Sequence, residues 1–312
     1  MKKIIALILV SVLCLSVFSA CSKDTSSNTE PSETQNSEPV VLNDPLCDGK
    51  TLKVLAIGNS FSNDTTEYLY DIAVAHGMTD VVIGRLYYGA CTVQQHATYA
   101  KNNKTVYDYY KNTFGYWDKV TGVNMLHGLE DENWDIITLQ QASGTSGVAE
   151  SYDGCLEELI MYVNEHKTHP NAKLVWNMTW AYQGNSTHKD FERYGNRQDQ
   201  MYRAITDVVQ NVILPMDVFA VTIPAGTAIQ NARTGKFGDT LTIDGYHLNT
   251  LGKVITAYTW FGIFTGKLLD SIDLDTAGIT PLTTDEKTLI LNSVNTALEK
   301  PYEITDISEV VK

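Results

Sequence analysis

The sequence predicts an α/β fold, a three-layer α/β/α sandwich around a mainly parallel, five-stranded sheet. Short runs rich in β-branched residues alternate with longer segments whose apolar residues recur at helical spacing. The short runs are apolar nearly throughout, as expected of strands buried on both faces of a parallel sheet. With 312 residues and 43% hydrophobic content, the chain can also fill the core of such a sandwich.

The expected elements begin near Lys50 and continue as one domain. The strands are expected at Lys53–Gly58, Asp80–Leu86, Asp135–Leu139, Lys173–Met178 and Val218–Pro224. Helical spacing is clear in Leu69–His76, Leu156–Val163 and Met201–Val212. The Tyr- and Asn-rich segment Tyr99–Asn133 is expected to decorate the rim. Strand–helix alternation of this kind predicts a functional site at the carboxyl ends of the strands.

Residues 1–21 predict export. Two lysines precede the apolar run IIALILVSVLCLSVF, which is too short and wrongly flanked for a stable membrane span. The run ends in FSAC and resembles a bacterial lipoprotein signal, in which Cys21 becomes the lipidated first residue. Phe18 departs from the usual Leu, and an ordinary secretory signal cut nearby is the alternative. Either signal exports the protein, and lipidation would bring it to a membrane through the anchor only.

Residues 22–49 are expected to form a flexible tether between this anchor and a body at residues 50–312. The segment is rich in Ser, Thr, Asn, Glu and Pro and cannot build a core. The whole chain has a net charge of −14 and no stripe of Lys and Arg. Nucleic acid is therefore not an expected partner, because binding to phosphates needs clustered cations.

Cysteine and histidine spacing predicts neither a disulfide framework nor a metal centre. Three cysteines, Cys47, Cys91 and Cys155, lie in the body and allow at most one bridge. No His, Cys and Asp cluster has the spacing of metal ligands, and no Gly-rich loop for phosphate is found. No cofactor is expected.

Ser60 is a candidate nucleophile. It follows the first expected strand by two residues, in VLAIGNSFSND. The sequence DTTE, Asp64–Glu67, has the pattern of a capping box that opens the next helix. Ser60 would then lie at the carboxyl edge of the sheet near a positive helix end, where backbone N–H groups can stabilise an oxyanion.

A nucleophilic serine needs a base and a group that orients the base, and TIDGYHLN supplies both. Asp244 lies three residues before His247. Gly245 allows a sharp turn that folds the carboxylate back toward the imidazole, and Asn249 is expected to cap the following helix. His76 and His127 have no acid at useful spacing, His166 and His169 are expected at the surface, and His188 falls in a polar loop.

Together, GNSFS and DGYHLN resemble the first and last motifs of the SGNH/GDSL hydrolase superfamily. Gly89, in LYYGACT after the second strand, matches the glycine of the second motif. The resemblance covers about Lys50 to Lys267 and implies a flavodoxin-like sandwich with a Ser60–His247–Asp244 triad. It also implies that the N–H groups of Ser60 and Gly89 hold the oxyanion.

The chain departs from the superfamily pattern in two motifs. Asn59 stands where the first motif has Asp, and the third motif, Gly-x-Asn-Asp, is replaced by ITLQQASGTSG. The resemblance to sugar O-acetylesterase branches with a Gln in this motif implies that Gln140 or Gln141 supplies the missing amide, with Gln141 preferred.

Several further residues are expected near the substrate. Trp180 and Tyr182 follow the fourth strand in WNMTWAYQGN, and Tyr246 lies between Asp244 and His247. Their aromatic faces could stack on sugar rings, although core packing is the alternative for Trp180. Asn59 and His96 are further candidates for substrate contact, with a helix-surface position as the alternative for His96.

These observations predict a surface-anchored serine esterase that hydrolyses acyl esters, most plausibly O-acetyl groups on carbohydrate. The arrangement resembles an SGNH-like branch of bacterial surface lipoproteins. A lipid-directed esterase or lysophospholipase is one alternative, and the Tyr, Asn and Gln content of the expected rim argues against it. A non-catalytic glycan-binding lipoprotein on the same fold is the other.

Overall fold

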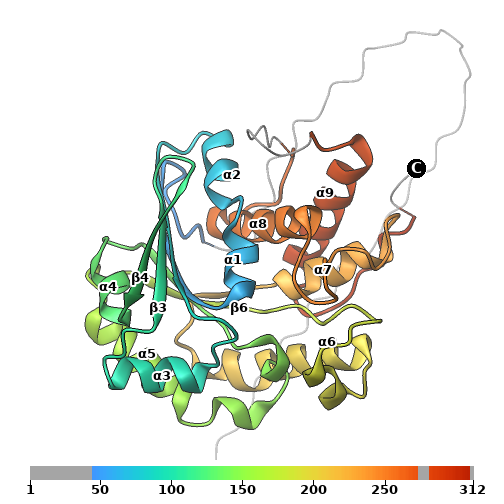
Figure 1. The fold of residues 1–312 in the computed structure, drawn as a ribbon. Coiled ribbons are helices and arrows are strands. Elements are labelled where there is room, and N and C mark those ends of the chain that lie inside the picture. Colours follow the sequence, from blue (N-terminus) through green and yellow to red (C-terminus); the bar gives the residue numbers. More distant parts are fainter. Residues whose placement is uncertain (1–43, 273–280, 310–312) are drawn as a thin grey trace, which may run out of the picture. The chain divides into compact units, whose positions relative to one another are not determined.

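The protein is described here from a computed structural model, which defines residues 44–272 and 281–309. The expected signal, Cys21 and residues 22–43 of the expected tether lie outside these residues. A seven-stranded sheet runs through the domain in the order β4-β3-β2-β1-β5-β6-β7 (Figure 1). Its strands are β1 Thr51–Gly58, β2 Asp80–Tyr87, β3 Tyr107–Asn112, β4 Trp117–Val123, β5 Ile136–Leu139, β6 Lys173–Asn177 and β7 Val221–Ile223.

The five predicted strands are confirmed as β2, β1, β5, β6 and β7, and all neighbouring pairs among them are parallel. Their order, β2-β1-β5-β6-β7, is that of a flavodoxin-like sheet, and β1 is the central strand of the full seven-stranded sheet. Four of the five residues of β6 are buried and all four of β5 are, which explains why both strands are largely apolar.

The prediction of five strands is wrong in number, because the segment Tyr99–Asn133 does not merely decorate the rim. It adds the antiparallel strands β3 and β4 to the sheet beside β2. The sequence YDYYKN of β3 alternates between buried and half-buried positions. The outer strand, β4, is exposed along most of its length and carries charged residues, as is typical of an edge that must not pair further.

Helices cover both faces of the sheet. The helices are α1 Ser60–Thr66, α2 Leu69–Ala75, α3 Val93–Lys101, α4 Met125–Glu130, α5 Cys155–His166, α6 Gln198–Val208, α7 Ala225–Thr234, α8 Thr250–Thr265 and α9 Thr284–Glu299. On one face α1, α2, α7 and α9 pack around α8, and α3, α4, α5 and α6 lie on the other (Figure 1). The three-layer arrangement is therefore as predicted, although α4, α7 and α9 were not predicted from the sequence.

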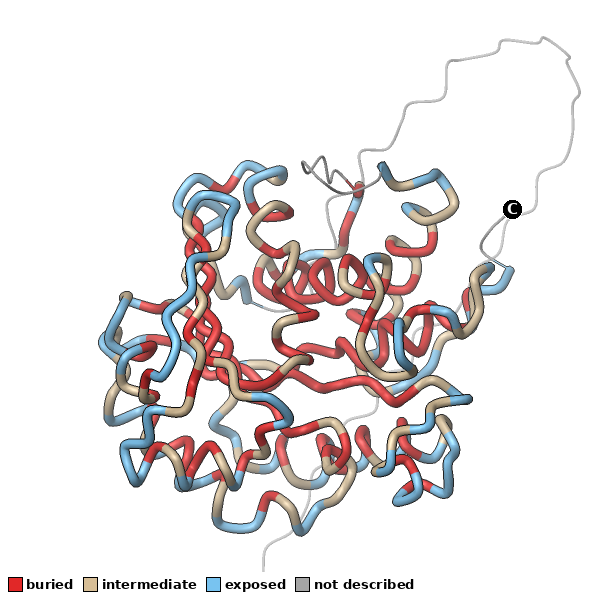
Figure 2. The backbone as a smooth tube through the Cα atoms, viewed as in Figure 1, coloured by how far each residue is buried: buried red, intermediate tan, exposed pale blue. Residues whose placement is uncertain are grey.

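Buried residues concentrate in the inner strands and in α8, whereas the outer turns and β4 are exposed (Figure 2). Helix α8 is apolar on all sides because other helices and the sheet surround it. Asn249 caps its first turn, as predicted. None of the helices in the described part of the chain is both long and apolar enough to cross a bilayer.

Candidate active site

Ser60 lies where β1 ends and α1 begins. Asn59 is extended and caps α1, its side-chain oxygen accepting the N–H of Phe61 at 3.0 Å. The helix therefore begins at Ser60 itself, and the predicted capping box at Asp64–Glu67 is wrong. Because β1 is the central strand, this turn places Ser60 at the carboxyl edge of the sheet, between the loops that follow β2 and β5.

Asp244 and His247 lie in a tight turn before α8. Gly245 has a φ of +93°, a left-handed conformation that favours glycine. One carboxylate oxygen of Asp244 accepts the backbone N–H groups of Tyr246 and His247 at 3.1 and 2.8 Å. These two bonds orient the carboxylate toward the imidazole, which is the turn that the sequence predicted.

The structure brings Ser60, His247 and Asp244 together. The His247 ring donates from Nδ1 to Asp244 Oδ2 at 2.6 Å, and Ser60 Oγ donates to Nε2 at 2.8 Å across 187 positions of sequence. Burial by itself would raise the pKa of Asp244, but hydrogen bonds from His247 and Tyr246 outweigh it and lower that pKa. A carboxylate, an imidazole and a hydroxyl thus stand in the order that activates a serine by general-base catalysis.

A second carboxylate, Asp64, joins the two parts of this arrangement, and sequence reasoning missed it. Its Oδ2 accepts the N–H of Leu248 at 2.9 Å, and its Oδ1 lies 3.4 Å from Lys253 Nζ. Burial raises the pKa of Asp64, opposed by the Leu248 N–H and by the charge of Lys253. Asp64 therefore ties α1, which begins at Ser60, to the residue next to His247. The only signal in the sequence is that Asp64 lies one helical turn after Ser60. This spacing has a meaning only if the helix is known to begin at Ser60.

A pocket of about 360 Å³ opens beside Ser60. Six of the predicted residues line it: Asn59, Ser60, Gly89, Tyr182, Tyr246 and His247. Within the described residues, no hydrogen bond uses the backbone N–H of Ser60 or of Gly89. Both groups are therefore available to a developing oxyanion at this end of the sheet.

Gln140 and Gln141 do not line the pocket. Gln141 donates from its amide to the carbonyl of Ser151 at 3.2 Å. Gln140 donates to Asn59 Oδ1 at 3.0 Å and accepts from Asn177 Nδ2 at 2.9 Å. Both side chains are buried and engaged with protein groups, so the geometry offers neither amide to an oxyanion.

Gln140 belongs instead to a chain of buried amides beneath Ser60. Trp260 donates to Asn177, Asn177 to Gln140, Gln140 to Asn59, and Asn59 to the carbonyl of Cys91 at 3.1 Å. The chain links α8 to the ends of β6, β5 and β1 and then to the loop after β2. An amide at position 59 can donate to the Cys91 carbonyl, whereas an ionised carboxylate cannot, which gives a physical reason for Asn in this motif.

Two predicted substrate contacts are wrong in position. Trp180 is fully buried beneath the pocket, stacked on Phe61 with ring centroids 4.0 Å apart, and it donates to the carbonyl of Tyr246. His96 is buried too, with Nδ1 2.9 Å from the Tyr107 hydroxyl, and is neither on the helix surface nor in the pocket. Burial lowers the pKa of His96 to about 3, so its ring is neutral.

The pocket residues that sequence reasoning missed include Ser143, His188 and Asp190. Ser143 lies in the loop after β5, and its hydroxyl is 2.9 Å from that of Tyr182. His188 and Asp190 lie in the loop after β6. Each follows a predicted strand, and the carboxyl ends of parallel strands share one edge, which is the signal that could have found them.

The described residues contain no group of three or more His, Cys, Asp or Glu side chains able to hold a metal ion. Cys47, Cys91 and Cys155 are free thiols. Burial raises the pKa of Cys91, so this thiol, although near the pocket, is protonated and not a competing nucleophile.

A family model described as "Domain of unknown function (DUF4886)" matches residues 53–274 of the chain. The chain belongs to the DUF4886 family. The crystal structure of a DUF4886 family protein from Bacteroides uniformis is 36% identical and has a TM-score of 0.77; the match covers 83% of this chain and 98% of that one.

The chain also resembles solved structures at lower identity than this. A variant of an acetylxylan esterase from Geobacillus stearothermophilus is 9% identical with a TM-score of 0.45; the match covers 69% of this chain and 95% of the esterase. That likeness is too low to carry an argument about the site. No curated protein sequence matches the chain.

Proposed function

We propose that this DUF4886 protein is a serine ester hydrolase with the roles Ser60 nucleophile, His247 general base and acid, and Asp244 orienting carboxylate. The observation that carries the proposal is the continuous hydrogen-bonded path from Asp244 through His247 to Ser60 at the mouth of a pocket. The geometry adds support to the superfamily resemblance, because it brings the residues of the first and last motifs into hydrogen-bond contact.

The reaction follows from these positions. Ser60 Oγ attacks the ester carbonyl while His247 Nε2 takes its proton, and the imidazolium that forms is stabilised by Asp244. The tetrahedral oxyanion faces the N–H groups of Ser60 and Gly89. His247 then gives the proton to the leaving alcohol, and a water molecule repeats the sequence on the acyl-enzyme.

The pocket favours a small acyl group on a polar alcohol. Its side chains are largely Tyr, Ser, Thr and His, and its apolar ones are Phe61, Ala90 and Ala142. A volume of about 360 Å³ suits an acetyl group and one sugar ring better than a long acyl chain. We therefore favour O-acetyl esters of carbohydrate over lipid substrates, with a glycan-binding protein without catalysis as the remaining alternative.

The decisive experiment is labelling by a fluorophosphonate probe together with hydrolysis of 4-nitrophenyl acetate. Wild type should label, Ser60→Ala should not, and His247→Ala should lower kcat by about three orders of magnitude or more. His169→Ala is the matched control, because His169 also lies near an aspartate, 3.4 Å from Asp135, but outside the pocket. A wild-type protein that never labels, or a fully active His247→Ala variant, would contradict the proposal.

Export and lipid anchoring at Cys21 form a separate part of the proposal, since residue 21 lies outside the described residues. The support is the sequence of the leader and the polar tether after it. Expressed with its leader in a bacterium, wild type should fractionate with membranes, and Cys21→Ala should be found in the soluble exported fraction. Membrane association that survives Cys21→Ala would count against the lipid anchor.

A further inference from the structure

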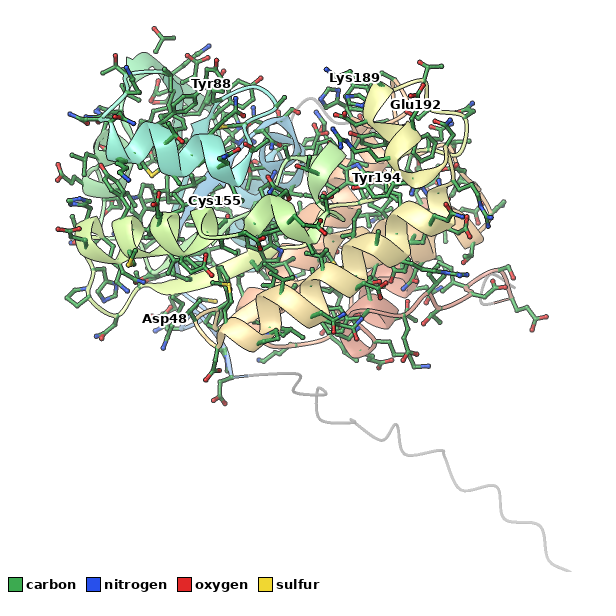
Figure 3. All side chains as sticks on the ribbon, turned by 90° about the horizontal axis from the view of Figure 1, so that it is seen from below. Asp48, Tyr88, Cys155, Lys189, Glu192 and Tyr194 are labelled. Atoms are coloured by element: carbon green, nitrogen blue, oxygen red, sulfur yellow. The ribbon has the colours of Figure 1, made fainter. Side chains whose placement is uncertain are left out.

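One wall of the pocket is formed by the loop after β6, where the 3-10 helix η3 spans Lys189–Tyr194. His188 caps this helix, its Nδ1 accepting the backbone N–H of Asp190 at 3.2 Å. Lys189 and Glu192 lie on the outer side of η3, and Tyr194 points into the domain (Figure 3). The turn thereby leaves His188 and Asp190 facing the pocket.

The cap fixes the proton of the His188 ring. Because Nδ1 accepts a backbone N–H, the neutral ring carries its hydrogen on Nε2, which is a donor. No hydrogen bond among the described residues uses this Nε2. The rings of Tyr182 and Tyr246, with centroids 4.8 and 4.7 Å away, restrict the plane of the imidazole. His188 therefore presents a free, oriented N–H donor at the pocket wall.

Asp190 supplies an acceptor beside this donor. Its carboxylate lies against the backbone of Gly144, so closely that a Cβ at position 144 would overlap it. On the outer side, Asp190 Oδ1 lies 3.5 Å from Arg193 Nε. A glycine in the loop after β5 and an arginine on η3 thus hold the carboxylate at the pocket.

A sugar ring carries several hydroxyl groups, each of which can donate and accept a hydrogen bond. The donor of His188 and the acceptor of Asp190, next to the aromatic ring of Tyr246, match such a ligand. The residues that line the pocket include no Lys or Arg, so nothing there would neutralise a carboxylate or phosphate on the ligand. We propose that His188 and Asp190 form the subsite that binds the hydroxyl groups of a neutral polyol, the alcohol part of the ester, and that Asp190 disfavours anionic sugars. This subsite rests on the proposed esterase function for its role, but its binding can be measured separately.

The test uses two probes that differ by one group, methyl 3-O-acetyl-glucoside and methyl 3-O-acetyl-glucuronoside. Binding is measured by calorimetry or ligand-observed NMR on the Ser60→Ala variant, which cannot consume them. We expect the glucuronoside to bind about tenfold more weakly, from repulsion by a carboxylate several ångströms away. Asp190→Asn should reduce this difference to about threefold or less. Glu192→Gln is the matched control, since it removes the same charge from the exposed side of η3.

Two further variants test the donor. His188→Ala should weaken binding of the glucoside by about tenfold or more, and His188→Gln, which keeps an N–H donor, should recover part of the loss. Equal affinity for the two probes, or unchanged affinity in both His188 variants, would overturn the subsite. If binding follows the expectation while wild type neither labels with fluorophosphonate nor hydrolyses 4-nitrophenyl acetate, the esterase function fails and the subsite stands.

Discussion

Asn59→Asp is a near-isosteric change that tests the buried amide chain beneath Ser60. The side chain of Asn59 is 2% exposed, donates to the Cys91 carbonyl at 3.1 Å and accepts from Phe61 and Gln140 at 3.0 Å each. A carboxyl keeps both accepting contacts. It keeps the donating contact only when it is protonated, because an ionised carboxylate would face the Cys91 carbonyl oxygen.

The magnitude can be bounded from this geometry. Loss of a buried hydrogen bond with its partner left unsatisfied lowers the free energy of unfolding by about 1–3 kcal/mol. Protonation of the new carboxyl restores the donor, but it costs free energy at any pH above the unfolded pKa of Asp, about 3.9. The cost is about 1.4 kcal/mol for each pH unit above that value, which gives about 4 kcal/mol at pH 7. We therefore expect a loss of about 2–4 kcal/mol at pH 7 and at most about 1.5 kcal/mol at pH 5.

The direction of the pH dependence follows from the linkage between protonation and folding. The folded pKa of the new carboxyl lies above its unfolded value, so its favourable contribution is complete at low pH and is lost as the pH rises through the folded pKa. Urea unfolding followed by tryptophan fluorescence at pH 5 and pH 7 measures the difference. Asn102→Asp is the control, since Asn102 donates to the Thr98 carbonyl at an exposed site. A loss below about 0.5 kcal/mol at both pH values, or one that does not shrink at pH 5, would refute the reasoning.

Substitutions at three other positions have definite expected outcomes. Asp64→Ala should lower the free energy of unfolding by about 1–3 kcal/mol and should lower kcat, because the buried Leu248 N–H loses its acceptor. Asp64→Asn keeps an acceptor, so its effects should be smaller. Urea unfolding and ester hydrolysis measure the two effects. Burial, together with a neighbouring carboxylate, raises the pKa of Asp71 to about 6, so its ionisation opposes folding as the pH rises through that value. Thermal melts should thus show Asp71→Asn more stable than wild type at pH 7.5, with the gap closing near pH 4; a gap independent of pH would contradict this. Gly84→Ala would set a Cβ 2.6 Å from the Trp134 ring, and we expect a loss of about 1–3 kcal/mol in urea unfolding, whereas an unchanged midpoint would show that the ring can move aside.

The parallel strands could be predicted from the sequence, because a strand buried on both faces is an apolar run of strand length and can be recognised locally. Strands β3 and β4 were missed because YDYYKN and the exposed β4 carry mixed polar and aromatic residues, which is also the pattern of a rim loop. Helix α7 was missed for a related reason. Its buried face includes Thr227, Gln230 and Asn231, whose polarity hides the helical period.

The sequence by itself determined which side chains could meet at the carboxyl edge of the sheet: Ser60 after the first strand, Gly89 after the second, and Asp244 and His247 before a late helix. Local spacing was sufficient for Ser60, Asp244 and His247, because each lies at the end of a recognisable element, whereas Gly89 was implied by the superfamily resemblance. Only the tertiary structure decided where the remaining side chains point. Gln140 and Gln141 turn inward to partners on other strands, Trp180 packs under Phe61, and Asp64 reaches Leu248 across 184 positions of sequence. The physical reason is that a loop side chain takes the direction in which its polar atoms find partners, and those partners come from segments remote in sequence.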